Sequence, residues 1–80
     1  MGLADRSISP RQNQVLGYLR EWFNGDMEAN AANYKRIARA IGWKQHGGVI
    51  DCLFALRAKG AVEAHGISQV RPERWKVIDG

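Results

Sequence analysis

The spacing of apolar residues changes once along this chain, after Gly60, and that change restricts the folds open to it. Before Gly60, apolar side chains recur at helical spacing in three stretches. After it, the apolar stretches Ala61–His65 and Trp75–Ile78 are short and favour strands. Eighty residues leave room for one hydrophobic core. We therefore expect a single α+β domain over residues 1–80, with residues 1–7 as a flexible N-terminal arm.

The first helix has a clear start in the sequence. Ser9 is a good N-cap residue, Pro10 suits the first helical position, and Gln12 stands where a capping box needs it. An apolar stripe follows at Val15, Leu16, Leu19, Trp22 and Phe23. The segment 24–26, Asn-Gly-Asp, is expected to end the helix.

A loop over residues 27–32 is expected next, with a short extended piece as the alternative. The second helix is predicted to begin with Asn33 as its N-cap, because asparagine accepts hydrogen bonds from the first helical N–H groups. Its buried stripe is Tyr34, Ile37, Ala38 and Ile41. Gly42 is placed to end it in a left-handed turn.

The third helix is expected over roughly Gly47–Lys59. Its inner face is predicted to be Val49, Cys52, Leu53 and Leu56. Lys59 and Gly60 form a typical helix end, a cation followed by glycine. Two short strands and the loop between them, residues 66–74, complete the chain. This order of three helices and a C-terminal β-hairpin predicts a winged helix-turn-helix.

Three stretches of the chain also carry a resemblance to a known family. They are Ile8–Gln12 with Val15, Leu16, Leu19 and Arg20; Ile37–Lys44; and Leu53–Glu63. In these stretches the chain resembles the N-terminal DNA-binding domain of LexA-type repressors. The resemblance implies a DNA-binding regulator of transcription, of bacterial or phage type. It does not extend to the self-cleaving protease half of those repressors, so no autoproteolysis is expected if the chain is whole.

The charge distribution agrees with a nucleic-acid partner. The net charge is +4, and no acidic residue lies between Ala29 and Ile50. Four basic residues fall in that stretch: Lys35, Arg36, Arg39 and Lys44. We expect them to contact phosphates beside the major groove of double-stranded DNA, since neutralising phosphates releases counterions. The alternative is a solvated helix face.

The resemblance implies that residues around the start of the third helix read the bases. The matching positions with hydrogen-bonding side chains are Gln45, His46 and Asp51. Glutamine can bind adenine with two hydrogen bonds, and histidine can donate to guanine or phosphate. The alternative is a helix cap beside an exposed histidine. Gly47 and Gly48 would allow the backbone to approach a phosphate, or would simply form a permissive turn.

Two further groups are candidates for contacts. Arg71 and Arg74 lie in the expected wing, where an arginine can enter a narrow minor groove; Arg74 could instead pack along Trp75. Ile50 and Phe54 are four residues apart and off the predicted core stripe of the third helix. They are either part of a wide core or a contact surface for a second copy or another protein.

Other classes of function find little support in the sequence. Cys52, His46 and His65 match no zinc spacing, so no metal site is expected. No catalytic constellation or cofactor motif is present, and we expect neither an enzyme nor a bound cofactor. The longest apolar runs are too short to span a membrane. The N-terminus lacks the apolar core of a secretory signal, so a cytoplasmic location is expected.

The sequence therefore predicts a sequence-specific, double-stranded DNA-binding transcriptional regulator. One small module buries little surface on DNA, so tight binding is expected to need two copies or a partner. One alternative is a winged-helix protein–protein module that works through Ile50, Phe54 and Trp75. The other is the DNA-binding domain of a larger replication or transposition protein.

Overall fold

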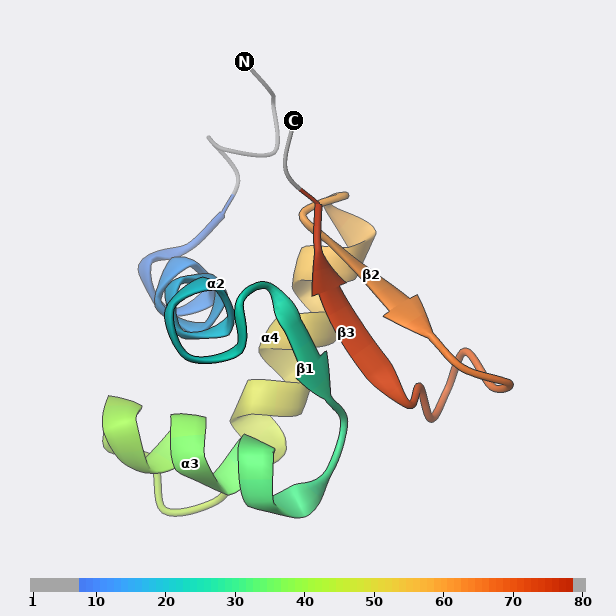
Figure 1. Ribbon diagram of the computed structural model, residues 1–80. Coiled ribbons are helices and arrows are strands. Elements are labelled where there is room, and N and C mark those ends of the chain that lie inside the picture. The colour runs from blue at the N-terminus through green and yellow to red at the C-terminus, as the bar shows by residue number, and fades with distance from the viewer. Residues whose placement is uncertain (1–7, 79–80) are drawn as a thin grey trace.

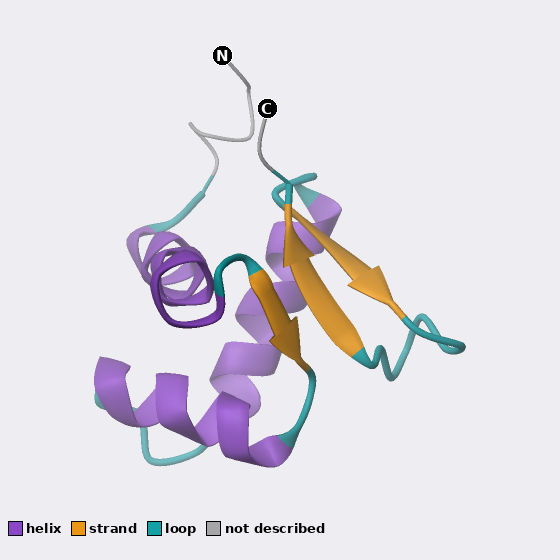
Figure 2. Ribbon diagram, viewed as in Figure 1, coloured by secondary structure: helices purple, strands orange, loops and turns teal. Residues whose placement is uncertain are grey.

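The computed structural model describes residues 8–78, which form three helices and a three-stranded antiparallel sheet (Figures 1 and 2). In chain order the elements are α2 (Pro10–Phe23), β1 (Asp26–Glu28), α3 (Ala31–Ile41), α4 (Gly47–Ala58), β2 (Val62–His65) and β3 (Arg74–Val77). The two helices α3 and α4 with the tight turn between them, followed by the β2–β3 hairpin, confirm the predicted winged helix-turn-helix. The predicted flexible arm, residues 1–7, lies outside the described residues.

Helix α2 begins and ends as its sequence predicts. The Ser9 hydroxyl accepts a hydrogen bond from the Gln12 amide at 3.2 Å, and the Gln12 side chain accepts one from the Ser9 amide at 3.2 Å. These two bonds form the expected capping box, with Pro10 as the first helical residue. Asn24 adopts the left-handed conformation that ends the helix, at φ 53°.

Strand β1 was not predicted as a strand; the sequence indicated a loop there with a short extended piece as the alternative. The strand pairs with β3, so the sheet order is β1-β3-β2. Met27 lies opposite Trp75 in that pairing, and both side chains are fully buried. One apolar residue between two acids is too short a pattern to predict a strand, and the burial of Met27 becomes evident only once β3 is beside it.

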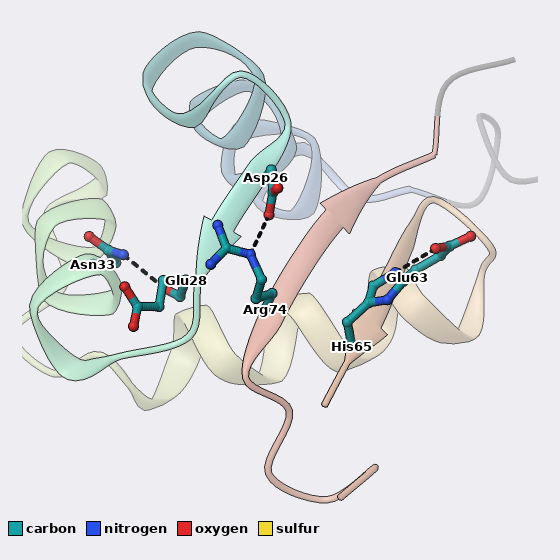
Figure 3. Close-up of polar contacts among 6 residues, drawn as sticks. All are labelled: Asp26, Glu28, Asn33, Glu63, His65 and Arg74. Carbon is teal, nitrogen blue, oxygen red and sulfur yellow. Dashed lines mark hydrogen bonds and ion pairs between the residues drawn. The ribbon is translucent and has the colours of Figure 1, made fainter. Parts of the chain in front are cut away.

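Helix α3 begins earlier than predicted. Its N-cap is Asn30, not Asn33: the Asn30 side chain accepts a hydrogen bond from the Asn33 amide at 2.8 Å. Asn33 is therefore the residue that is capped, and its own side chain donates to the Glu28 carbonyl at 2.8 Å (Figure 3). The predicted end of the helix is confirmed, since Gly42 adopts the left-handed conformation at φ 96°.

Helix α4 crosses behind the sheet and supplies the centre of the core (Figure 1). Its fully buried residues are Val49, Leu53 and Leu56, as predicted, while Cys52 is only half-buried. They pack with residues from every other element: Val15, Leu16, Leu19, Met27, Tyr34, Ile37, Ala38, Ala61, Val62 and Trp75. The side chain of Trp75 is fully buried, and its indole N–H donates to the Tyr34 hydroxyl at 2.9 Å. This bond ties the sheet to α3, and so fixes the hairpin relative to the helix-turn-helix.

Candidate nucleic-acid interface

The turn between α3 and α4, residues 42–46, brings basic side chains from two elements together. Lys35 and Arg39 are four residues apart on α3 and so share one face of that helix. Together with residues of the turn they line a surface hollow of about 310 Å³. We call this site the basic hollow; its lining is Lys35, Ala38, Arg39, Trp43, Lys44 and His46.

The composition of the basic hollow suits an anion. Lys35, Arg39 and Lys44 are all exposed, so their charges face solvent and not the core. None of the six lining residues is acidic. The first turn of α4, which begins directly after His46, also contains no acidic residue. Cations and a helix N-terminus both favour a bound anion, and the basic hollow combines the two.

His46 occupies the N-cap position of α4 without capping it. Its side chain makes no capping hydrogen bond, and its ring lies parallel to that of Tyr34, with centroids 6.1 Å apart. The side chain is half-buried at the edge of the basic hollow. His46 is therefore a wall of the basic hollow and not a side-chain cap of α4, and its predicted contact with DNA stays a prediction.

Trp43 forms one wall of the basic hollow, and its position depends on Gly48. A β-carbon added at Gly48 would lie 3.0 Å from two carbon atoms of the Trp43 ring. Glycine at position 48 thus lets the ring lie directly on the start of α4. At Gly47 an added β-carbon would meet nothing within 4 Å. Neither sequence interpretation of this glycine pair included a packing role for Trp43.

Arg36 is separated from the other basic residues of α3. Its guanidinium lies over the ring of Trp22, 4.4 Å from the centroid, and 5.7 Å from the centroid of Phe23. Both rings belong to the end of α2, and Arg36 is not among the residues lining the basic hollow. One residue along a helix turns the side chain by about 100°, which places Arg36 and Lys35 on different faces.

The remaining candidates near α4 lie outside the basic hollow. Gln45 is exposed in the turn, and Asp51 is exposed on α4. Both are accessible to a base edge, and their predicted contacts stay predictions. Ile50 and Phe54 are half-buried against the core, and the ring of Phe54 meets that of Trp75 edge-on at 5.1 Å. The interpretation of Ile50 and Phe54 as part of a wide core is thus the one supported by their packing.

The two predicted arginines of the wing differ in their surroundings. Arg74 donates from Nε to Asp26 Oδ1 at 2.8 Å and so bridges β3 to β1 (Figure 3). This hydrogen bond, with the charge of Arg74, holds the pKa of Asp26 below its usual value. Arg71 is exposed, and no ion pair of its side chain is recorded among residues 8–78. Of the two, Arg71 has its charge available for a phosphate or groove.

Sequence reasoning missed Arg57, which attaches the wing to α4. Its guanidinium donates to the Gln69 backbone carbonyl at 3.1 Å and also to the Gln69 side-chain oxygen. Gln69 lies in the loop between β2 and β3, and no pattern in the sequence links that loop to the last turn of α4. A second contact on the hairpin is local, between His65 and Glu63 at 2.7 Å (Figure 3).

Other features of the described chain add no further site. Within residues 8–78, no group of three or more His, Cys, Asp or Glu side chains could hold a metal ion. No helix in the same range is long and apolar enough to cross a membrane. Comparison of the chain with models of protein families, with curated proteins and with solved structures found no match.

Proposed function

We propose that this protein binds double-stranded DNA as a sequence-specific regulator of transcription. The observation that carries this proposal is the basic hollow, where Lys35, Arg39 and Lys44 gather with His46 at the start of α4. In helix-turn-helix proteins the second helix of the motif enters the major groove, and its N-terminal residues meet the base edges. Phosphates flanking the groove would then lie against the hollow.

The exposed candidate residues of α3, the turn and α4 divide into two roles under this proposal. Lys35, Arg39 and Lys44 bind the phosphate backbone, which positions the protein but carries little sequence information. Gln45 is exposed in the turn before α4 and Asp51 is exposed on α4, and their side chains offer hydrogen bonds to bases. Arg71 extends the contact from the wing.

The alternative of a protein–protein module has less support, because one of the three residues that it would use is buried. Trp75 is fully buried, and Phe54 packs edge-on against it. The alternative of a module from a larger replication or transposition protein would use the same basic hollow on DNA.

The salt dependence of duplex binding tests the proposal. Duplexes selected from a random pool by this protein would serve as ligands. Each phosphate contact contributes a slope of about 0.9 to the plot of log K against log salt concentration. Lys35→Ala, Arg39→Ala and Lys44→Ala should each reduce the slope by about 1, and weaken binding to all sequences alike.

Arg36→Ala and Lys76→Ala are the matched controls for that series. Each removes one positive charge from the exposed surface, but neither residue lines the basic hollow. We expect both to leave the slope nearly unchanged. A slope that falls equally for all five variants would show binding by net charge alone. No duplex binding at low salt would contradict the proposal outright.

A further inference from the structure

The loop between β2 and β3, residues 66–73, is held in place from two sides; we call it the wing loop. Arg57 of α4 binds the backbone carbonyl and the side chain of Gln69. Inside the loop, the Ser68 hydroxyl accepts hydrogen bonds from the amides of Val70 and Arg71, both at 3.2 Å. The wing loop is therefore a bonded turn attached to the helix that the proposed function places in the major groove.

Two aliphatic residues, one on each side of Gln69, are largely exposed to solvent. Ile67 is 97% exposed and Val70 is 78% exposed, the highest values among the large apolar residues of the described chain. The hairpin that carries them extends from the body of the molecule (Figure 1). Neither residue contributes to the core, because neither is part of the hydrophobic cluster.

Area and charge indicate which partner these side chains fit. A specific protein interface buries about 800 Å² on each partner, far more than two aliphatic side chains can cover. One or two apolar side chains are enough for a wedge between stacked base pairs. Arg71 follows Val70 directly and is exposed, which favours a polyanion beside the wedge.

We propose that Ile67 and Val70 form an apolar wedge that enters the minor groove of the bound duplex, separates a base step and bends the DNA. This proposal rests on the proposed function, since it requires a bound duplex. Apolar wedges of this kind unstack a base step and kink the DNA duplex towards the major groove. Arg57 acts as a positioning residue, because its two bonds to Gln69 keep the loop from yielding when the wedge meets the base stack.

The test compares the wild-type protein with the double variant Ile67→Ser/Val70→Ser. Duplexes selected by the wild type would carry 2-aminopurine at successive positions, and its fluorescence would report unstacking of the bases. The same duplexes would carry a dye at each end, and energy transfer between the dyes would report bending. Wild-type binding should raise the fluorescence at one step and shorten the end-to-end distance. The double variant should lose both signals, and its affinity for the duplex should fall by about tenfold or more. Its salt slope should stay unchanged, because no charge has been removed.

Ile78→Ser is the control for removal of an exposed apolar side chain. Ile78 is 40% exposed and lies just after β3, outside the wing loop. The Ile78→Ser variant should have the same duplex affinity, 2-aminopurine fluorescence and bending as the wild type. Arg57→Gln provides a separate test of positioning: it should reduce bending while Ile67 and Val70 remain.

Four results would overturn the wedge. Wild-type protein that binds the duplex without unstacking or bending it would refute the wedge but not DNA binding. The same conclusion follows if the double variant keeps both signals. If the wild type sediments as a dimer and the double variant as a monomer, with bending unaffected, the wing loop is an interface between copies. If the wild type binds no duplex at all, the proposed function fails first, and the wedge with it.

Discussion

Gly47 and Gly48 are neighbours in the first turn of α4, but only at Gly48 does the Trp43 ring occupy the space that a β-carbon would need. The sequence offered one explanation for both residues, either a backbone approach to phosphate or a permissive turn. The structure gives them different surroundings, because Trp43 packs on one residue and leaves the other open. At this scale, the wall of the basic hollow depends on the absence of a single methyl group.

Alanine at each glycine separates these surroundings. Gly47→Ala should stabilise the protein by roughly 0.5 kcal/mol, because alanine reduces the conformational entropy of the unfolded chain without a clash. Gly48→Ala should lack that gain, since its methyl group would displace Trp43, and should weaken duplex binding through the altered hollow. Urea unfolding and duplex titration of both variants measure these effects. Equal stability and equal DNA affinity in the two variants would show that the contact between Trp43 and Gly48 is unimportant.

At the scale of elements, local signals in the sequence predicted most of the helix ends, although the N-cap of α3 is Asn30 and not the expected Asn33. The capping box at Ser9 and the left-handed turn at Gly42 were predicted because each involves only nearby residues. Strand β1 was missed because it is defined by β3, far along the chain. The sequence grouped Lys35, Arg36, Arg39 and Lys44 by their place in an acid-free stretch, but it did not predict the basic hollow that three of them line. Arg36 lies over Trp22 because one step along the helix turns its side chain away from Lys35, and Trp43 reaches the hollow only in the folded turn.

The pairing of β1 with β3 supplies a prediction about pH. The pKa of Asp26 is lowered in the folded protein, chiefly by the hydrogen bond from Arg74. The stabilisation is therefore complete above the unfolded value of about 3.9, and is lost as pH falls through the folded pKa. Asp26→Asn should be less stable than the wild type at pH 7, and the difference should disappear in acid. Urea unfolding at a series of pH values measures it.

Glu28→Gln is the matched control for that series. It removes an exposed carboxylate from the same strand, and no ion pair of Glu28 is recorded among the described residues. Its stability relative to wild type should vary less with pH than that of Asp26→Asn. If both variants show the same pH profile, the Asp26–Arg74 bridge contributes nothing to the stability of the sheet.

At the scale of the whole molecule, one buried hydrogen bond joins the two halves of the proposed interface. Tyr34 belongs to α3, stacks on His46 beside the basic hollow, and accepts the indole N–H of Trp75 from the hairpin. A chain of this length buries only about 60% of its unfolded surface, so its total stability is small. A single bond between α3 and the sheet therefore affects both folding and the position of the wing.

Tyr34→Phe removes the acceptor and leaves the ring in place. The N–H of the fully buried Trp75 would then lack its partner, at a cost of about 1–3 kcal/mol. Because each kcal/mol shifts the Tm of so small a domain by about 4–8 °C, thermal unfolding should detect the loss. Tyr18→Phe is the control, because it also removes one hydroxyl. The centroid of the Tyr18 ring lies 4.3 Å from that of Trp22, and within residues 8–78 the Tyr18 hydroxyl has no recorded hydrogen bond. Tyr18→Phe should melt close to the wild type. If the two variants melt at the same temperature, the bond between Tyr34 and Trp75 does not hold the hairpin to α3, and the core packing around Trp75 alone fixes the wing.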